Sequence, residues 1–139
     1  MKVRVIVLRT AGTNCDRETA YAFERSGAAT ELVHINQLVR RERSLREYDI
    51  LAIPGGFSYG DDIAAGKILA NELAFRLTDE VRAFVAARKP VIGICNGFQV
   101  LAKAGLLPSG AGALTQRVTL TFNDSGKFED RWVMLKVNR

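Results

Sequence analysis

Short apolar runs alternate with amphipathic stretches along the first 105 residues. Runs rich in apolar and β-branched side chains predict strands at residues 3–8, 31–35, 50–53 and 91–94. Helix-like stretches follow at residues 16–26, 71–88 and 97–103; within 71–88 the apolar positions recur every three to four residues. This order predicts an α/β fold with a doubly wound, mostly parallel sheet and helices on both faces.

The pattern changes after Pro108. Residues 118–122 and 132–137 have the composition of two strands, and the turn-like sequence Asn-Asp-Ser-Gly at residues 123–126 lies between them. We therefore expect an antiparallel or edge pair of strands here. The length of 139 residues suits a single domain, and no internal repeat or linker divides the chain.

The bulk composition is that of an ordinary soluble domain, with 47% hydrophobic and 25% charged residues. The apolar runs are too short to span a bilayer, and nothing near the N-terminus resembles a signal peptide. We expect a cytoplasmic protein with no membrane partner. Two cysteines make no disulfide framework, and a single histidine, His34, makes a zinc site improbable.

The formal net charge of +5 raises the question of nucleic-acid binding. The most basic stretch, residues 40–47, is interrupted by acidic side chains and has no aromatic residues for base stacking. The sequence therefore predicts a solvated connection, with a contact for an acidic partner protein as the alternative. No nucleic-acid partner is predicted.

The strongest chemical signal is the sequence Gly-Ile-Cys-Asn-Gly at residues 93–97, between a strand and a helix. It has the form of a nucleophile elbow with cysteine in place of serine. Gly93 and Gly97 would remove side chains that collide around the turn, and the helix N-terminus would favour the thiolate of Cys95. The N–H of Asn96 could face a developing oxyanion. The alternative is a buried structural cysteine at a strand end.

Two further loops follow strands whose carboxyl ends should meet this elbow, because ligands of open α/β sheets bind at that edge. They are residues 10–16 and residues 54–62. Glycines Gly55 and Gly56 would let a backbone N–H approach a substrate as a second oxyanion donor, although a plain turn has the same composition.

The remaining polar residues of these loops have simpler interpretations. Asp61 and Asp62 are more typical of solvent-facing or helix-capping carboxylates than of a metal site, so no metal is predicted. Cys15 is expected to be a packed, unreactive thiol. His34 is expected to be structural, because the second strand should be displaced from the other three in a doubly wound order.

The loops together carry a resemblance to a family. Residues 12–16 read Gly-Thr-Asn-Cys-Asp, residues 54–61 read Pro-Gly-Gly-Phe-Ser-Tyr-Gly-Asp, residues 93–99 read Gly-Ile-Cys-Asn-Gly-Phe-Gln, and residues 123–133 read Asn-Asp-Ser-Gly-Lys-Phe-Glu-Asp-Arg-Trp-Val. The chain resembles the class I (triad) glutamine amidotransferases, and in particular the glutaminase subunits of phosphoribosylformylglycinamidine synthase. The resemblance covers essentially the whole chain.

The resemblance implies a set of roles. Cys95 would attack the side-chain amide of glutamine and form a thioester, Asn96 with Gly56 or Gly55 would bind the oxyanion, and Gln99 and Phe57 would contact glutamine. Ammonia would pass to a synthetase subunit in de novo purine biosynthesis, with a small accessory subunit as a further partner. No cofactor is expected on this chain; ATP and Mg are expected on the synthetase.

One departure from the family pattern limits this reading. The family completes its triad with a later His-x-Glu segment, which residues 1–139 do not contain. We therefore expect a single amidotransferase-like domain that is incomplete at its C-terminus and nearly inactive alone. Two alternatives remain open: a non-catalytic docking module of the synthetase complex, and a single-domain cysteine hydrolase of related fold.

Overall fold

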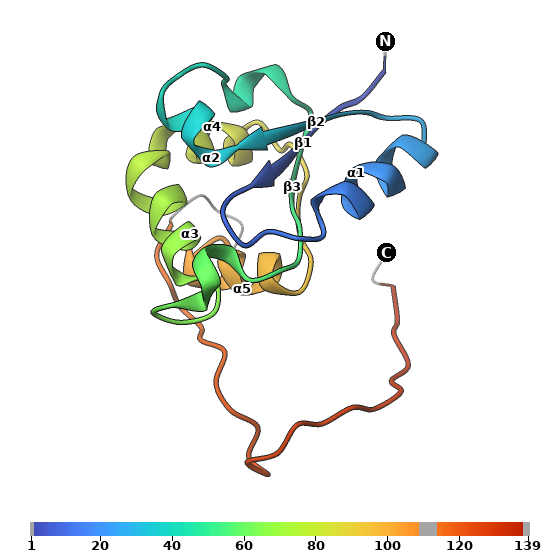
Figure 1. Ribbon diagram of the computed structural model, residues 1–139, viewed down its shortest axis with the longest axis vertical. Helices are drawn as coiled ribbons and strands as arrows, with labels where there is room; N and C mark the ends of the chain where they lie inside the picture. Colours follow the sequence, from blue (N-terminus) through green and yellow to red (C-terminus); the bar gives the residue numbers. More distant parts are fainter. Residues whose placement is uncertain (1, 109–113, 138–139) are drawn as a thin grey trace.

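Four parallel strands form the sheet of the protein, in the order β2-β1-β3-β4 (Figure 1). The computed structural model describes residues 2–108 and 114–137. The predicted doubly wound α/β architecture is confirmed, and so are the four predicted strands to within two residues at each end. Their bounds are β1 (Arg4–Arg9), β2 (Ala29–His34), β3 (Ile50–Ile53) and β4 (Val91–Gly93).

Helices cover both faces of this sheet. Helix α1 (Asp16–Arg25) lies on one face, and the other helices lie on the opposite face (Figure 1). These are α2 (Ile35–Val39), α3 (Lys67–Asn71), α4 (Thr78–Ala86) and α5 (Asn96–Lys103), with 3₁₀ turns η1 (Leu45–Glu47) and η2 (Ser58–Asp61) and a π-helical turn η3 (Glu72–Arg76).

Strand β1 is buried on both sides, which explains its unbroken apolar run. Val5 and Val7 pack on the α1 face, whereas Ile6 and Leu8 join the larger core under α2–α5. Each large aliphatic side chain buried in this way contributes about 1.5–3 kcal/mol. Two cores, one on each face, therefore fix the position of the central strand.

Strand β4 has less cover than β1. Ile92 pairs in register with Ala52, whose side chain faces α1, but α1 packs over β1 and β2. Ile92 and Ile94 consequently remain 41% and 45% exposed. The α1-side face of β4 is thus an apolar surface that the described residues leave open.

The predicted helix over residues 71–88 is wrong in its start and its continuity. The helical segment begins at Lys67, widens into the π-helical turn η3, and breaks at Leu77 before α4. Leu77 has non-helical backbone angles (φ −117°, ψ 19°), yet its side chain is buried with Leu73 and Val81. The apolar spacing therefore identified the buried face correctly but could not show the break in the backbone.

The predicted strand pair at residues 118–122 and 132–137 is also wrong. These residues form no strand, and they follow an extended path away from the sheet (Figure 1). The side chains of Phe122, Trp132 and Met134 are almost fully exposed. Two strands alone are marginally stable without a sheet or helix to cover one face, and no described element covers this pair.

A polar cluster ties β2 to the connection before β3. The carboxylate of Glu31 accepts hydrogen bonds from Arg43 Nε and the Tyr48 hydroxyl, each at 2.7 Å. These bonds, that from Arg43 above all, lower the pKa of Glu31 below its ordinary value of 4.5. Desolvation and the nearby carboxylate raise the pKa of Tyr48. The ionised form of Glu31 is therefore favoured by folding.

We predict that Glu31→Gln reduces the pH dependence of stability in acid. Because the folded-state pKa of Glu31 is depressed, its contribution is complete above the unfolded pKa, near 4.5, and is lost as the pH falls through the folded value. The stability gap between wild type and Glu31→Gln, measured by urea unfolding, should be constant from pH 6 to 8 and shrink below pH 4.5. A gap that grows in acid would contradict this. Glu18→Gln, on the exposed side of α1, is the control.

Helix α5 approaches the sheet so closely that its first turn requires glycine. A Cβ on Gly97 would lie 1.9 Å from the carbonyl oxygen of Ile53, and a Cβ on Gly93 would lie 2.5 Å from the carbonyl oxygen of Gly97. No side chain can occupy either position without moving α5 away from β3 and β4. The collision predicted from the sequence for these two glycines is confirmed.

Replacing Gly97 by alanine should destabilise the fold by about 2–4 kcal/mol, because the new methyl group overlaps backbone atoms. The sign is diagnostic, since the same change at an open helical position is stabilising by about 1 kcal/mol. Gly27→Ala is the control for backbone strain without collision, because φ there is 90° but a Cβ meets no heavy atom within 4 Å; it should cost about 1 kcal/mol. Urea unfolding measures the free energy of unfolding of both variants. A loss for Gly97→Ala that is equal to or smaller than the loss for Gly27→Ala would exclude the close contact.

Candidate active site at the carboxyl ends of β1, β3 and β4

Cys95 occupies a strained turn between β4 and α5. Its backbone angles are φ 52° and ψ −110°, in a region that side-chain-bearing residues rarely adopt, and it is the N-cap of α5. Its side chain is exposed to solvent. This is the geometry of a nucleophile elbow, which displays its side chain at the top of a sheet, so the alternative of a buried structural cysteine is wrong.

The side chain of Asn96 joins this elbow to the loop after β3. Asn96 is 3% exposed. Its Oδ1 accepts hydrogen bonds from the backbone N–H and the hydroxyl of Ser58, at 3.2 and 2.7 Å. Its Nδ2 donates to Asp61 Oδ1 at 3.1 Å and to Gln99 Oε1 at 3.2 Å. A buried amide with its polar atoms paired in this way fixes the relative position of two loops.

The loop after β1 is paired to the loop after β3 through backbone hydrogen bonds. Thr13 and Gly56 form an isolated antiparallel bridge, and Phe57 N–H donates to the Gly12 carbonyl at 2.9 Å. The fit is tight, because a Cβ on Gly12 would lie 1.9 Å from the carbonyl oxygen of Phe57. The convergence of the three loops, expected from the topology, is therefore confirmed.

Gly55 lies between the two cysteines of the chain. A Cβ on Gly55 would be 3.4 Å from Cβ of Cys95 and 3.7 Å from Sγ of Cys15. Cys15 is the N-cap of α1 and is exposed, so the expectation of a packed thiol is wrong. The reason is its place at a loop-to-helix junction. The buried residues of the first turn of α1 are Asp16 and Thr19, whereas the Cys15 side chain stays exposed.

Two backbone amides near Cys95 have no protein acceptor among the described residues. Among the described residues, neither the N–H of Asn96 nor that of Gly56 donates to a protein acceptor. Gly56 has φ 135°, and a Cβ there would lie 2.8 Å from Asn14 N. Glycine at this position thus allows both a positive φ and the close approach of the loop after β1.

The other residues singled out from the sequence lie in or near the same group of loops, with one exception. Phe57 is 62% exposed beside the paired loops, and Gln99 lies one turn into α5. Asp61 Oδ1 accepts from the Gly66 N–H at 3.0 Å as well as from Asn96, which accounts for this carboxylate as a capping group. His34 is the exception.

His34 ends β2, at the opposite edge of the sheet from β4. Its Nδ1 accepts the backbone N–H of Asn36 at 3.2 Å and caps α2. The prediction of a structural histidine is confirmed. Its distance from Cys95, across two intervening strands, excludes it as the base for this thiol in the described fold.

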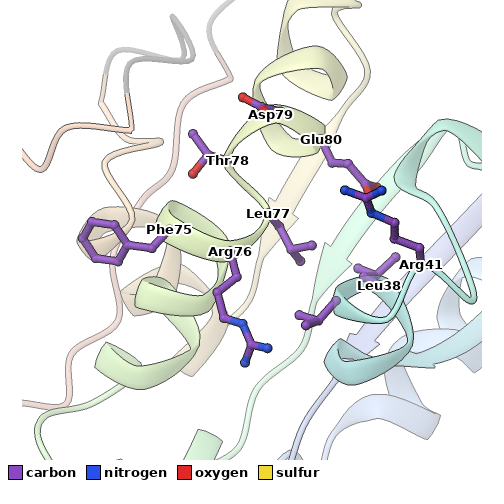
Figure 2. Close-up of a pocket in the computed structure, with 9 residues that line it drawn as sticks. Leu38, Arg41, Phe75, Arg76, Leu77, Thr78, Asp79 and Glu80 are labelled. Atoms are coloured by element: carbon purple, nitrogen blue, oxygen red, sulfur yellow. The ribbon is translucent and has the colours of Figure 1, made fainter.

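A cavity of about 220 Å³ lies elsewhere on the molecule (Figure 2). It is lined by Leu38 and Arg41 from the end of α2 and by residues 75–80 at the η3–α4 junction. None of these residues belongs to the three loops around Cys95. The cavity is therefore separate from the three loops around Cys95.

Comparison with protein families matches residues 2–139 to the CobB/CobQ-like glutamine amidotransferase domain. The chain belongs to this family. The match spans all three loops and the residues after Pro108, so it agrees with the resemblance carried by the individual motifs.

Two similar relatives are subunits of phosphoribosylformylglycinamidine synthase. The chain is 53% identical over 137 residues to phosphoribosylformylglycinamidine synthase subunit PurQ of Dehalococcoides mccartyi, covering 99% of this chain and 53% of the relative. It is 48% identical to the subunit PurQ of Treponema denticola, covering 97% and 54%. It therefore spans about half the length of the curated relatives that it matches.

A solved structure has the same fold. The structure of PurLQS from Thermotoga maritima contains a chain with a TM-score of 0.71 and 36% identity to this one, covering 96% of this chain and 54% of that chain. The amidotransferase fold of the described residues is thus that of roughly half of a PurQ chain. No helix in residues 2–108 and 114–137 has the length and hydropathy needed to cross a membrane.

Sequence reasoning missed the residues that hold the site together. Asn96 was identified for its backbone N–H, whereas its side chain is the buried link between Ser58, Asp61 and Gln99. One sequence pattern could have indicated this role of the Asn96 side chain. It is an amide residue next to a nucleophile, together with short polar side chains in another loop that is expected to lie nearby.

Removing this link should loosen the loop after β3. We predict that Asn96→Ala destabilises the protein by about 1–3 kcal/mol, since it leaves the hydroxyl and N–H of Ser58 without their buried acceptor. It should also speed proteolysis within residues 54–66. Asn36→Ala, on the exposed side of α2, is the control and should change the free energy of unfolding by less than about 0.5 kcal/mol. Equal effects of the two variants would refute the role of Asn96.

Proposed function

We propose that this chain carries the nucleophile and the oxyanion site of a glutaminase. The observation that supports this best is the strained, exposed Cys95 next to two backbone amides, Asn96 and Gly56, that have no protein acceptor among the described residues. Amides held by buried hydrogen bonds need no reorganisation when charge develops on a substrate oxygen.

The proposed reaction starts with attack of the Cys95 thiolate on the side-chain carbonyl carbon of glutamine. The carbonyl electrons move to oxygen, and the N–H groups of Asn96 and Gly56, with Gly55 as the alternative donor, stabilise the oxyanion. The C–N bond then breaks, ammonia leaves with an added proton, and a glutamyl thioester remains on Cys95. Water cleaves the thioester and releases glutamate. Gln99 and exposed Phe57 would contact the glutamine.

Proton transfer is the step for which these residues provide no histidine near Cys95. His34 is the one histidine in the sequence, and it lies at the far edge of the sheet. Attack can proceed from a thiolate, but ammonia departure and thioester hydrolysis need a proton carrier. We therefore propose that the 139 residues react with glutamine analogues at Cys95 and release glutamate only slowly.

The names of the relatives supply the proposed context. PurQ is a subunit of phosphoribosylformylglycinamidine synthase, and the Thermotoga structure is of PurLQS. By analogy, ammonia from glutamine would pass to a PurL-like synthetase in purine biosynthesis, where ATP and Mg would act, with a PurS-like subunit as a further partner. A cytoplasmic location stays a prediction.

A docking module without catalysis is the second candidate. The position of His34 favours it, because no other histidine is available within these residues. Such a module would use its surface, including the apolar face at Ile92 and Ile94, and would have no need of a reactive thiol.

Labelling with an electrophilic analogue of glutamine distinguishes the two functions. We predict that the analogue modifies Cys95 and leaves Cys15 free, as measured by peptide mass spectrometry, whereas iodoacetamide modifies both exposed thiols. Gly12→Ala, which displaces the loop after β3, should slow analogue labelling on the order of tenfold while iodoacetamide labelling of Cys95 is unchanged. Equal labelling of Cys15 and Cys95 by the analogue would favour the docking module.

A further inference from the structure

The proposed glutaminase reaction uses one thiol, yet the site holds two. Cys15 and Cys95 are both exposed and follow strands β1 and β4, which flank β3 in the sheet. Both cysteines lie near the position that a Cβ on Gly55 would take. Sγ of Cys15 is 3.7 Å from that position, and Cβ of Cys95 is 3.4 Å from it. The Cys15 sulfur therefore lies no more than about 7 Å from Cβ of Cys95.

We propose that Cys15 and Cys95 form a reversible disulfide, in which Cys15 captures Cys95 after a hydroperoxide has oxidised it. This inference goes beyond the proposed glutaminase function, since it requires no glutamine. It assigns a role to Cys15 that the attack on an amide does not need.

The absence of a side chain at Gly55 leaves open the space between Cys15 Sγ and Cys95 Cβ. No Cβ occupies the space between them, and the backbone of Gly55 holds Cys15 in place by accepting its N–H at 3.3 Å. The Cys15 thiol makes one weak bond, to Asn14 Oδ1 at 3.4 Å, which rotation of the side chain would break. A disulfide needs Cβ atoms about 3.8 Å apart, so the proposal requires the loop that carries Cys15 to move toward Cys95.

The chemistry balances in two steps. The Cys95 thiolate attacks a peroxide oxygen, the O–O bond breaks, and Cys95 becomes a sulfenic acid while the peroxide is reduced to water or an alcohol. The Cys15 thiolate then attacks the Cys95 sulfur, an S–S bond forms, the S–O bond breaks, and hydroxide leaves and takes up a proton. A dithiol reductant restores both thiols with two electrons.

The consequence is protection of the nucleophile. A sulfenic acid on an exposed cysteine continues to the sulfinic acid when peroxide persists, and that product is not reduced by thiols. A thiol held within reach diverts Cys95 to a form that thiols can reduce. The disulfide would also block attack on any substrate until it is reduced.

Hydrogen peroxide and peptide mapping test this proposal on the full 139-residue chain. The reduced protein at low concentration is treated with hydrogen peroxide, blocked with iodoacetamide and digested with trypsin without reductant. We expect a disulfide between the peptides of residues 10–17 and 89–103, which contain Cys15 and Cys95 and which dithiothreitol separates. In Cys15→Ser, sulfinic acid on Cys95 should form on the order of tenfold faster.

Three outcomes would overturn the proposal. The first is absence of the linked peptide while Cys95 reaches the sulfinic acid at the same rate in wild type and Cys15→Ser. The second is a linkage found only in disulfide-bonded dimers on a non-reducing gel. The third is equal accumulation of the linked peptide in protein unfolded with urea, which would show that the fold does not bring the thiols together. Failure here leaves labelling of reduced Cys95 by a glutamine analogue unaffected, so the two proposals fail separately.

Discussion

The close approach of helix α5 to the end of strand β3 is the contact on which the site depends. Gly97 makes it possible, because its missing side chain leaves room for the Ile53 carbonyl. With α5 this close, the buried amide of Asn96 reaches Ser58 and Asp61 and fixes the loop after β3. That loop is in turn paired to the loop after β1 through Thr13 and Gly56. One backbone contact thus determines the geometry around Cys95.

The sequence predicts the features that depend on local chemistry and on topology. Apolar runs identify the four strands, and the parallel order follows from the helices between them. The elbow could be predicted because glycines on both sides of a cysteine leave room for a sharp turn. The structure confirms this, since a Cβ on Gly93 or Gly97 would collide with backbone atoms. The role of Asn96 in binding the loops was not predictable, since it depends on side chains 35 and 38 residues away.

The errors have a common physical origin. Residues 118–122 and 132–137 have strand-like composition, but composition does not supply the covering face that a strand pair needs, and Trp132 remains exposed. The helix break at Leu77 preserves the burial of that side chain, so the apolar spacing does not reveal it. Cys15 was expected to be a packed thiol, whereas its place at the start of α1 leaves it exposed. In each case tertiary context decided the outcome.

We propose that the folded loops hold the N–H groups of Asn96 and Gly56 in place to bind an oxyanion beside Cys95. The most direct measurement is a crystal structure of the chain after Cys95 has reacted with an electrophilic ketone analogue of glutamine. We predict that the ketone oxygen accepts hydrogen bonds from the N–H groups of both residues, at about 2.7–3.1 Å. A ketone oxygen that points to solvent, with neither amide in reach, would contradict it.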